Sequence, residues 1–260
     1  LNVTNCSNSG NVTGWRYCAG IVGNISSGNQ PSTITGCVNT GAVSSDSYNA
    51  GGIVGNIYGQ VTVDSCYNRG SCTSGSYRAG GITAYLASSS AAVKNCYTTG
   101  ETKVAYGSDS HAVIGSKSSG TVENCYYLSG LTADTSAAAK TADELKALAP
   151  TLGDAFLAAP ADLNDGYPIL RWQVPTYTVT FTVDPAGAEV TIDGQTGTHT
   201  EGRWVFVLPD GTYSYSVRAF GYLEKTGELT VQGGTVDESV TLAAAARRSV
   251  TFTVTPADAN

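Results

Sequence analysis

The chain has 260 residues, 41% of them hydrophobic, which is enough to build a core in each of two ordinary domains. Only 13% of the residues are charged, methionine is absent and glycine is abundant, a composition typical of an extracellular all-β protein. The net charge of −7 is uneven: residues 1–130 carry six basic and five acidic side chains, and residues 131–260 carry eight and sixteen. Neither half offers the basic surface that nucleic-acid binding requires.

No apolar run reaches the length of a membrane span, and no signal peptide is present. The chain opens at Leu1, already inside the first of the repeats described next. We therefore expect a piece of a longer extracellular protein, with the secretion signal and a cell-wall anchor outside it and no membrane contact within it.

Five cysteines recur at a nearly fixed spacing along the first half of the chain. The gaps between them are 31, 29, 30 and 29 residues, the spacing of a stacked repeat architecture. Alternating stretches such as "VTVDSC" precede them and indicate strands. We predict a β-solenoid over residues 1–130, with one or two turns per repeat and an inward column of cysteines. Its members are Cys6, Cys37, Cys66, Cys96 and Cys125.

A polar motif follows each cysteine. Asn8, Asn39 and Asn68 stand two residues after it, and a glycine (Gly10, Gly41, Gly70, Gly100) stands four residues after it. The pattern predicts a strand end and a turn in which the glycine takes a positive φ. We expect the cysteines and asparagines to form structural ladders with reduced, buried thiols, although an oxidising exterior leaves disulfides as the alternative. The spacing does not suggest a metal site.

Three tyrosines directly follow cysteines of the column: Tyr67, Tyr97 and Tyr126. If the cysteines point inward, a period of two places these rings on the outer surface as an aromatic strip. Two interpretations remain open. The rings either support each other across the strands, or they form a platform for sugar rings or a protein partner.

Residues 131–174 read as a helical capping segment and a closing strand. In "TADELKALAP", Thr141 and Glu144 form a capping box and Pro150 is expected to end the helix. We expect the apolar residues that follow to cover the open end of the solenoid. Asp162, Asn164 and Asp165 suggest either a calcium loop or a simple turn, and their spacing fits no EF-hand, which favours the turn.

From residue 175 the pattern changes to short alternating strands with Asp-Gly turns, typical of an immunoglobulin-like β-sandwich over residues 175–246. Tyr213, Tyr215 and Val217 share one face and are expected in its core. "VTFTVTPADAN" at 250 restates "VTFTVDPAGAE" at 179, so residues 247–260 read as the first strand of a second sandwich. This strand belongs to a tandem array, or it docks on a neighbouring edge and drives head-to-tail self-association.

The "GGIVGNI…VxxCYNxG" pattern resembles the GLUG repeats of bacterial surface proteins, which implies a β-helix over residues 1–130. "LGDAFLAAPADLNDGYPILRWQ" resembles the segment that closes such regions in surface proteins of Gram-positive gut bacteria. "PAGAEVTIDG" and "LPDGTYSYSV" resemble the PEGA family, with Ala186 in place of its glutamate. The resemblances imply an architecture and say little about activity.

Catalytic chemistry has little support in the sequence. The two histidines, His111 and His199, lie in different regions, and His111 reads as an exposed turn residue. Carboxylates of the solenoid are scattered in repeat phase, unlike the paired acids of a glycosidase. We therefore expect no cofactor and a non-enzymatic cell-surface adhesin or stalk that binds glycans or a host protein. The alternatives are an accessory region of a secreted carbohydrate-active enzyme and a self-assembling extracellular filament subunit.

Overall fold

A computed structural model describes residues 1–26 and 30–246. The chain forms two compact units, residues 1–173 and residues 174–260, and each is considered by itself. Almost all of the regular structure in the described residues is β-strand. No helix in this part of the chain is long and apolar enough to cross a membrane.

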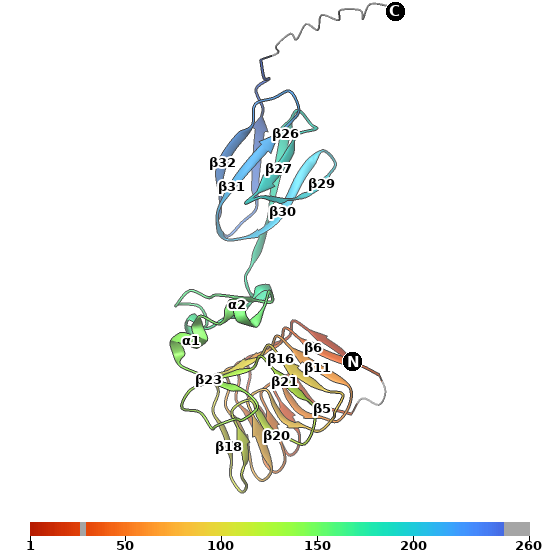
Figure 1. Ribbon diagram of the computed structural model, residues 1–260, viewed down its shortest axis with the longest axis vertical. Coiled ribbons are helices and arrows are strands. Elements are labelled where there is room, and N and C mark those ends of the chain that lie inside the picture. The colour runs from red at the N-terminus through yellow and green to blue at the C-terminus, as the bar shows by residue number, and fades with distance from the viewer. Residues whose placement is uncertain (27–29, 247–260) are drawn as a thin grey trace, which may run out of the picture. The chain divides into compact units, whose positions relative to one another are not determined.

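The first unit is a β-solenoid of about four turns, in which each coil contributes one short strand to each of five parallel sheets (Figure 1). The first sheet contains β1 (Asn2–Thr4), β6 (Ser32–Thr35), β11 (Val61–Asp64), β16 (Ala92–Lys94) and β21 (Thr121–Glu123). The second contains β2 (Ser7–Asn8), β7 (Val38–Asn39), β12 (Tyr67–Asn68), β17 (Tyr97–Thr98), β22 (Tyr126–Leu128) and β23 (Ala138–Lys140).

The other three sheets complete each coil. The third contains β3 (Val12–Gly14), β8 (Val43–Ser45), β13 (Cys72–Ser74) and β18 (Thr102–Val104). The fourth contains β4 (Cys18–Ala19), β9 (Ala50–Gly51), β14 (Arg78–Gly80) and β19 (Asp109–His111). The fifth contains β5 (Val22–Ile25), β10 (Val54–Ile57), β15 (Thr83–Leu86) and β20 (Ile114–Lys117).

The strand register shows that one sequence repeat makes one coil. Thr62 pairs with Thr33 on one side and Ala92 on the other, offsets of 29 and 30 residues that equal the local spacing of the cysteines. Inside the coils, Ile34, Val63 and Val93 stack in the same core as four cysteines of the column. The predicted β-solenoid is therefore confirmed.

The prediction of positive φ at the glycines of the C-x-N-x-G motif is wrong. The left-handed position is instead the residue immediately before each cysteine: Asn5, Gly36, Ser65, Asn95 and Asn124, with φ between 51° and 63°. Asparagine and glycine tolerate this conformation better than most other residues. The motif glycines are required for another reason, because a Cβ on Gly70 would lie 1.9 Å from the carbonyl oxygen of Gly41 in the preceding coil.

Two short helices, α1 (Ala142–Lys146) and α2 (Ala149–Leu152), follow the last coil. The capping box of Thr141 and Glu144 is present in α1. Pro150 does not end a single helix but lies in the first turn of α2, where its missing N–H costs nothing. The segment continues through β24 (Phe156–Leu157), a 3₁₀ turn (Asn164–Gly166), β25 (Ile169–Leu170) and a second 3₁₀ turn (Arg171–Gln173).

This capping segment covers the side of the solenoid and not its end, contrary to the sequence-based expectation. Leu145, Leu152 and Phe156 pack with Val38 and with tyrosines of the second sheet. The end of the solenoid is covered by residues 129–140, where β23 pairs with β22 and Asp134 accepts hydrogen bonds from the amides of Val113 and Ile114.

The second unit contains two four-stranded sheets. One has the order β29 (Thr198–Thr200), β30 (Arg203–Pro209), β26 (Thr176–Asp184) and β33 (Val236–Thr241). The other has the order β28 (Gln195–Thr196), β27 (Glu189–Ile192), β31 (Gly211–Arg218) and β32 (Lys225–Val231). Both sheets contribute to one apolar cluster, in which Tyr215 and Val217 are buried and Tyr213 packs at the edge, as predicted. The predicted strand at residues 247–260 lies outside the described residues.

Candidate functional site

The aromatic strip expected on the outer surface is not accessible. The rings of Tyr67 and Tyr97 do point away from the cysteine column, and they stack with a centroid separation of 5.0 Å. However, the capping segment covers both, and their exposed fractions are 1% and 0%. The Tyr97 hydroxyl donates to the carbonyl of Pro168, and the Tyr67 hydroxyl donates to Gln173. Burial raises the pKa of both phenols.

Tyr126 is half-buried at the edge of the same cluster. Its hydroxyl donates to Asn124 at 2.6 Å, within the polar corner of its own coil. The three predicted ligand-binding tyrosines are therefore brought together, but as the packing surface for the capping segment. Alternation along the strand could predict their direction, whereas only the docking of residues distant in sequence could decide their burial.

The asparagines predicted as a structural ladder do form one. Asn8 donates to the side-chain oxygen of Asn39 at 2.8 Å, and Asn39 donates to Asn68 at 2.7 Å. Each also donates to the carbonyl of the glycine two residues later. Asn68 then meets Thr98, which replaces asparagine in the next coil. Both asparagines beyond the first coil are fully buried, so the ladder joins the coils and is closed to ligands.

The cysteine column is also structural. Cys37, Cys66, Cys96 and Cys125 are buried, Cys6 in the first coil is exposed, and all seven cysteines of the chain are free. Burial in apolar surroundings raises the pKa of Cys96 and raises that of Cys72, which lies off the column, to about 12. Such thiols are poor nucleophiles because the thiolate is the reactive form.

A second row of tyrosines, which the sequence analysis missed, lies on the surface where the coil enters the fourth sheet. It consists of Arg16, Tyr17, Tyr48 and Tyr77, here called the tyrosine–arginine row. Tyr48 and Tyr77 stack with centroids 4.6 Å apart and planes 8° apart, and Tyr17 meets Tyr48 edge-on at 5.7 Å. The Arg16 guanidinium lies 4.2 Å from the centre of the Tyr48 ring and donates to its hydroxyl.

A periodic signal for this row was present in the sequence. Tyr17, Tyr48 and Tyr77 are 31 and 29 residues apart, the same spacing as the first two gaps of the cysteine column. Each precedes a strand of the fourth sheet by one or two residues, so the coils stack the rings directly above one another. Stacking at nearly the strand separation fixes the rings before a ligand arrives.

A second aromatic pair extends the surface. Tyr58 is 48% exposed and meets Tyr85 edge-on at 5.7 Å, and Arg78 lies over the Tyr85 ring at 4.0 Å. The pKa of Tyr58 is raised by partial burial and further by Tyr17 and Tyr85, which places the pair beside the row. Aromatic rings and arginines gathered on an exposed surface are the composition of binding hot spots.

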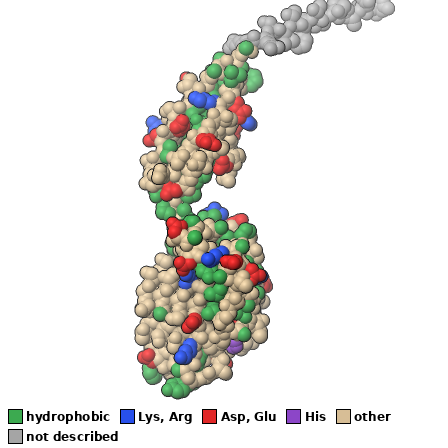
Figure 2. Space-filling view, turned by 90° about the vertical axis from the view of Figure 1, so that its left-hand side faces the viewer, with side chains coloured by type: hydrophobic (Ala, Val, Ile, Leu, Met, Phe, Trp, Pro, Cys, Tyr) green, Lys and Arg blue, Asp and Glu red, His purple; other side chains and the backbone are tan. Residues whose placement is uncertain are grey.

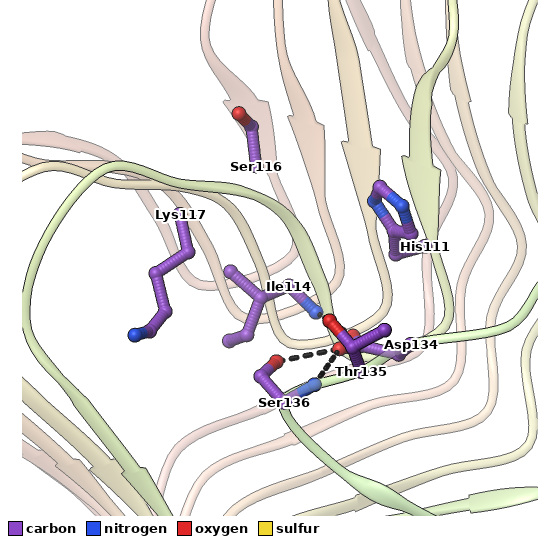
Figure 3. A pocket seen from close by; sticks show the side chains of 7 residues that line it. All are labelled: His111, Ile114, Ser116, Lys117, Asp134, Thr135 and Ser136. Atoms are coloured by element: carbon purple, nitrogen blue, oxygen red, sulfur yellow. Dashed lines mark hydrogen bonds between the residues drawn. The ribbon is translucent and has the colours of Figure 1, made fainter.

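The end of the solenoid carries a cavity of about 420 Å³, lined by residues that include His111, Lys117 and Asp134 (Figure 3). Asp134 is 6% exposed, and its oxygens accept from the amides of Val113, Ile114 and Ser136 and from the Ser136 hydroxyl. His111 is half-buried in β19, not in an exposed turn as predicted, and its Nδ1 bonds the carbonyl of Gly115 at 2.7 Å. The carboxylate is thus fully used in closing the solenoid.

The loop once considered for calcium has a different use. Arg69 of the second sheet bonds the side chains of Asn164 and Asp165, and Asn164 also donates to the Tyr97 hydroxyl. The arginine lowers the pKa of the Asp165 carboxyl through this pairing. The loop therefore fastens the capping segment to the solenoid.

No protein-family model matches the chain, and no curated protein matches it. Among solved structures, the chain is similar to a protein from Bacteroides ovatus described as a "putative immunoglobulin A1 protease". The two share 24% identity with a TM-score of 0.52, over 66% of this chain and 57% of that one. The chain therefore spans little more than half of that structure, and the similarity shows a shared fold alone.

Proposed function

We propose that the chain is a non-enzymatic region of a bacterial cell-surface adhesin or stalk, and that it binds glycans or a host protein through the tyrosine–arginine row. The observation that carries the proposal is a stacked, exposed set of rings held on rigid coils. Tyr77 is 47% exposed and Trp15, next to the row in sequence, is 64% exposed. Large exposed aromatics that are already ordered lose little conformational entropy on binding.

The surface chemistry agrees with this proposal. On the face shown in Figure 2, charged side chains are scattered over the first unit among uncharged polar ones. A surface without a strong field favours ligands recognised by ring stacking and hydrogen bonds over highly charged polymers.

We further propose that the coils are GLUG repeats and that the two sheets of the second unit are a PEGA-like, immunoglobulin-like β-sandwich. The single-coil repeat supports the first assignment, and a core shared between two four-stranded sheets supports the second. Repeats of both kinds suit an extended extracellular stalk, attached to the cell wall by regions outside this sequence.

The proposal is tested by binding the purified chain to a glycan array and to cultured epithelial cells. The double variant Tyr48→Ala/Tyr77→Ala is expected to lose binding. A matched control, Phe220→Ala/Tyr222→Ala, removes two exposed rings of the second unit and is expected to bind as the wild type does. Equal loss in both variants would show that the row has no special role.

An enzymatic role is the competing proposal, since the similar structure is described as a "putative immunoglobulin A1 protease". The same preparation is incubated with immunoglobulin A1 and with a panel of polysaccharides. We expect no cleavage, because His111 is held by a carbonyl in the first unit and His199 lies against Trp204 in the second. Turnover of any of these substrates would overturn the non-enzymatic assignment.

A further inference from the structure

The tyrosine–arginine row ends at an open ring face. Tyr77 stacks on Tyr48 from the side of the second coil. On its other face, toward the fourth coil, no aromatic ring or cation stacks within residues 1–26 and 30–246. The stack is therefore covered by Arg16 at the first coil and uncovered at Tyr77.

The fourth coil leaves the space for a further ring unfilled. The register pairs Arg78 with Asp109, and the amide of Tyr106 donates to the carbonyl of Gly75, so Ser108 is the partner of Tyr77. The position that would carry the next tyrosine thus carries a serine, preceded by Gly107. Tyr106 is displaced by two residues and is 82% exposed, so its ring stands beside this space and does not occupy it.

We propose that the open face of Tyr77 is the binding subsite for one ring of a neutral glycan, bounded by Tyr106 and Ser108. This inference rests on the proposed function and names its ligand class. The C–H bonds on the flat side of a pyranose ring carry partial positive charge, which the negative face of an aromatic ring attracts. The hydroxyls of Tyr77, Tyr106 and Ser108 offer donors and acceptors for the sugar hydroxyls.

The nearby charges favour a neutral sugar over an acidic one. Arg78 faces Asp109 at 3.5 Å and lies on Tyr85, and Arg16 lies on Tyr48. Both cations are already engaged, and Asp109 would repel an anion. An acidic sugar would therefore lack a free cation to pair with at this subsite.

The test uses the whole chain and four defined probes: cellohexaose, xylohexaose, maltohexaose and mannohexaose. Binding is measured by titration calorimetry up to about 10 mM, above the Kd of a weak millimolar complex. We expect at least one hexaose to bind, and Tyr77→Ala to weaken it about tenfold, near the upper end of one aromatic contact.

The decisive variant is Ser108→Tyr, which completes the stack and fills the subsite without removing any side chain that could bind sugar rings. It is expected to abolish hexaose binding while leaving the Tm unchanged or raised, because cross-strand aromatic pairs are stabilising. The control Ser71→Tyr places the same ring beside β13 at another exposed corner of the third coil and should bind as the wild type does.

Each outcome separates this inference from the proposed function. Hexaose binding that survives Ser108→Tyr would overturn the subsite and leave the surface-binding role standing. If no hexaose binds, but cell binding is lost in Tyr48→Ala/Tyr77→Ala, the ligand class is wrong and the row still binds a partner. If neither the hexaoses nor the cells bind, both proposals fail.

Discussion

The asparagine ladder allows a stability prediction that can be worked from individual contacts. Asn68 is fully buried, donates to the carbonyl of Gly70 at 2.7 Å, and accepts from the Asn39 side chain at 2.7 Å and from the Gly70 amide at 3.2 Å. Asn68→Ala leaves these three groups without that partner. A buried polar group without a partner costs about 1–3 kcal/mol, so the expected loss in the free energy of unfolding is about 3–5 kcal/mol.

Two further substitutions serve as controls. Asn8 makes the equivalent donation to Gly10 at the exposed first coil, where water can replace it, so Asn8→Ala should cost less than about 1 kcal/mol. Asn68→Thr copies the fourth coil, in which the Thr98 hydroxyl accepts from the Gly100 amide, and should recover about half of the loss.

Thiol labelling in increasing denaturant is the suitable assay, because all seven cysteines lie in the solenoid and report on its opening alone. Asn68→Ala should expose the buried thiols at a clearly lower denaturant concentration than the wild type, and Asn8→Ala should not. Equal midpoints for these two variants would refute the claim that buried amide bonds join the coils.

Three other predictions concern the thiols, the capping segment and the second unit. Burial raises the pKa of Cys72 from 9.0 to about 12, so in this range the unfolded chain loses its proton first and stability falls as the pH rises from about 9 to 12. Alkaline melting should show this decline, and Cys72→Ala should reduce it; a Tm independent of pH would contradict it. Arg69→Ala should free the loop at Asp165 and increase proteolysis within residues 153–173, whereas equal cleavage would show that the ion pair does not fasten the segment. Phe181 is fully buried, so Phe181→Ala should destabilise the second unit by about 3–5 kcal/mol, followed by Trp204 fluorescence. The solenoid thiols should stay protected in that variant, and their exposure would show that the two units unfold together.

The sequence by itself determined the coil. A cysteine every 29–31 residues fixes the offset between strands, because strands in register must repeat at the length of one turn. It also predicted the inward thiols, the asparagine ladder and the capping box at Thr141, since each depends on neighbours within one repeat or one helix turn.

Tertiary structure alone decided which surfaces remain open. Alternation places Tyr67 and Tyr97 on the outside of the coil, but packing by Leu145 and Phe156 from the capping segment removes them from solvent. The period of the cysteines also fits Tyr77, yet only the stacked coils show that its ring is ordered on one face and free on the other. Periodicity specifies the direction of a side chain relative to its own strand. Its exposure depends on contacts with segments far away in the chain, and no local pattern records them.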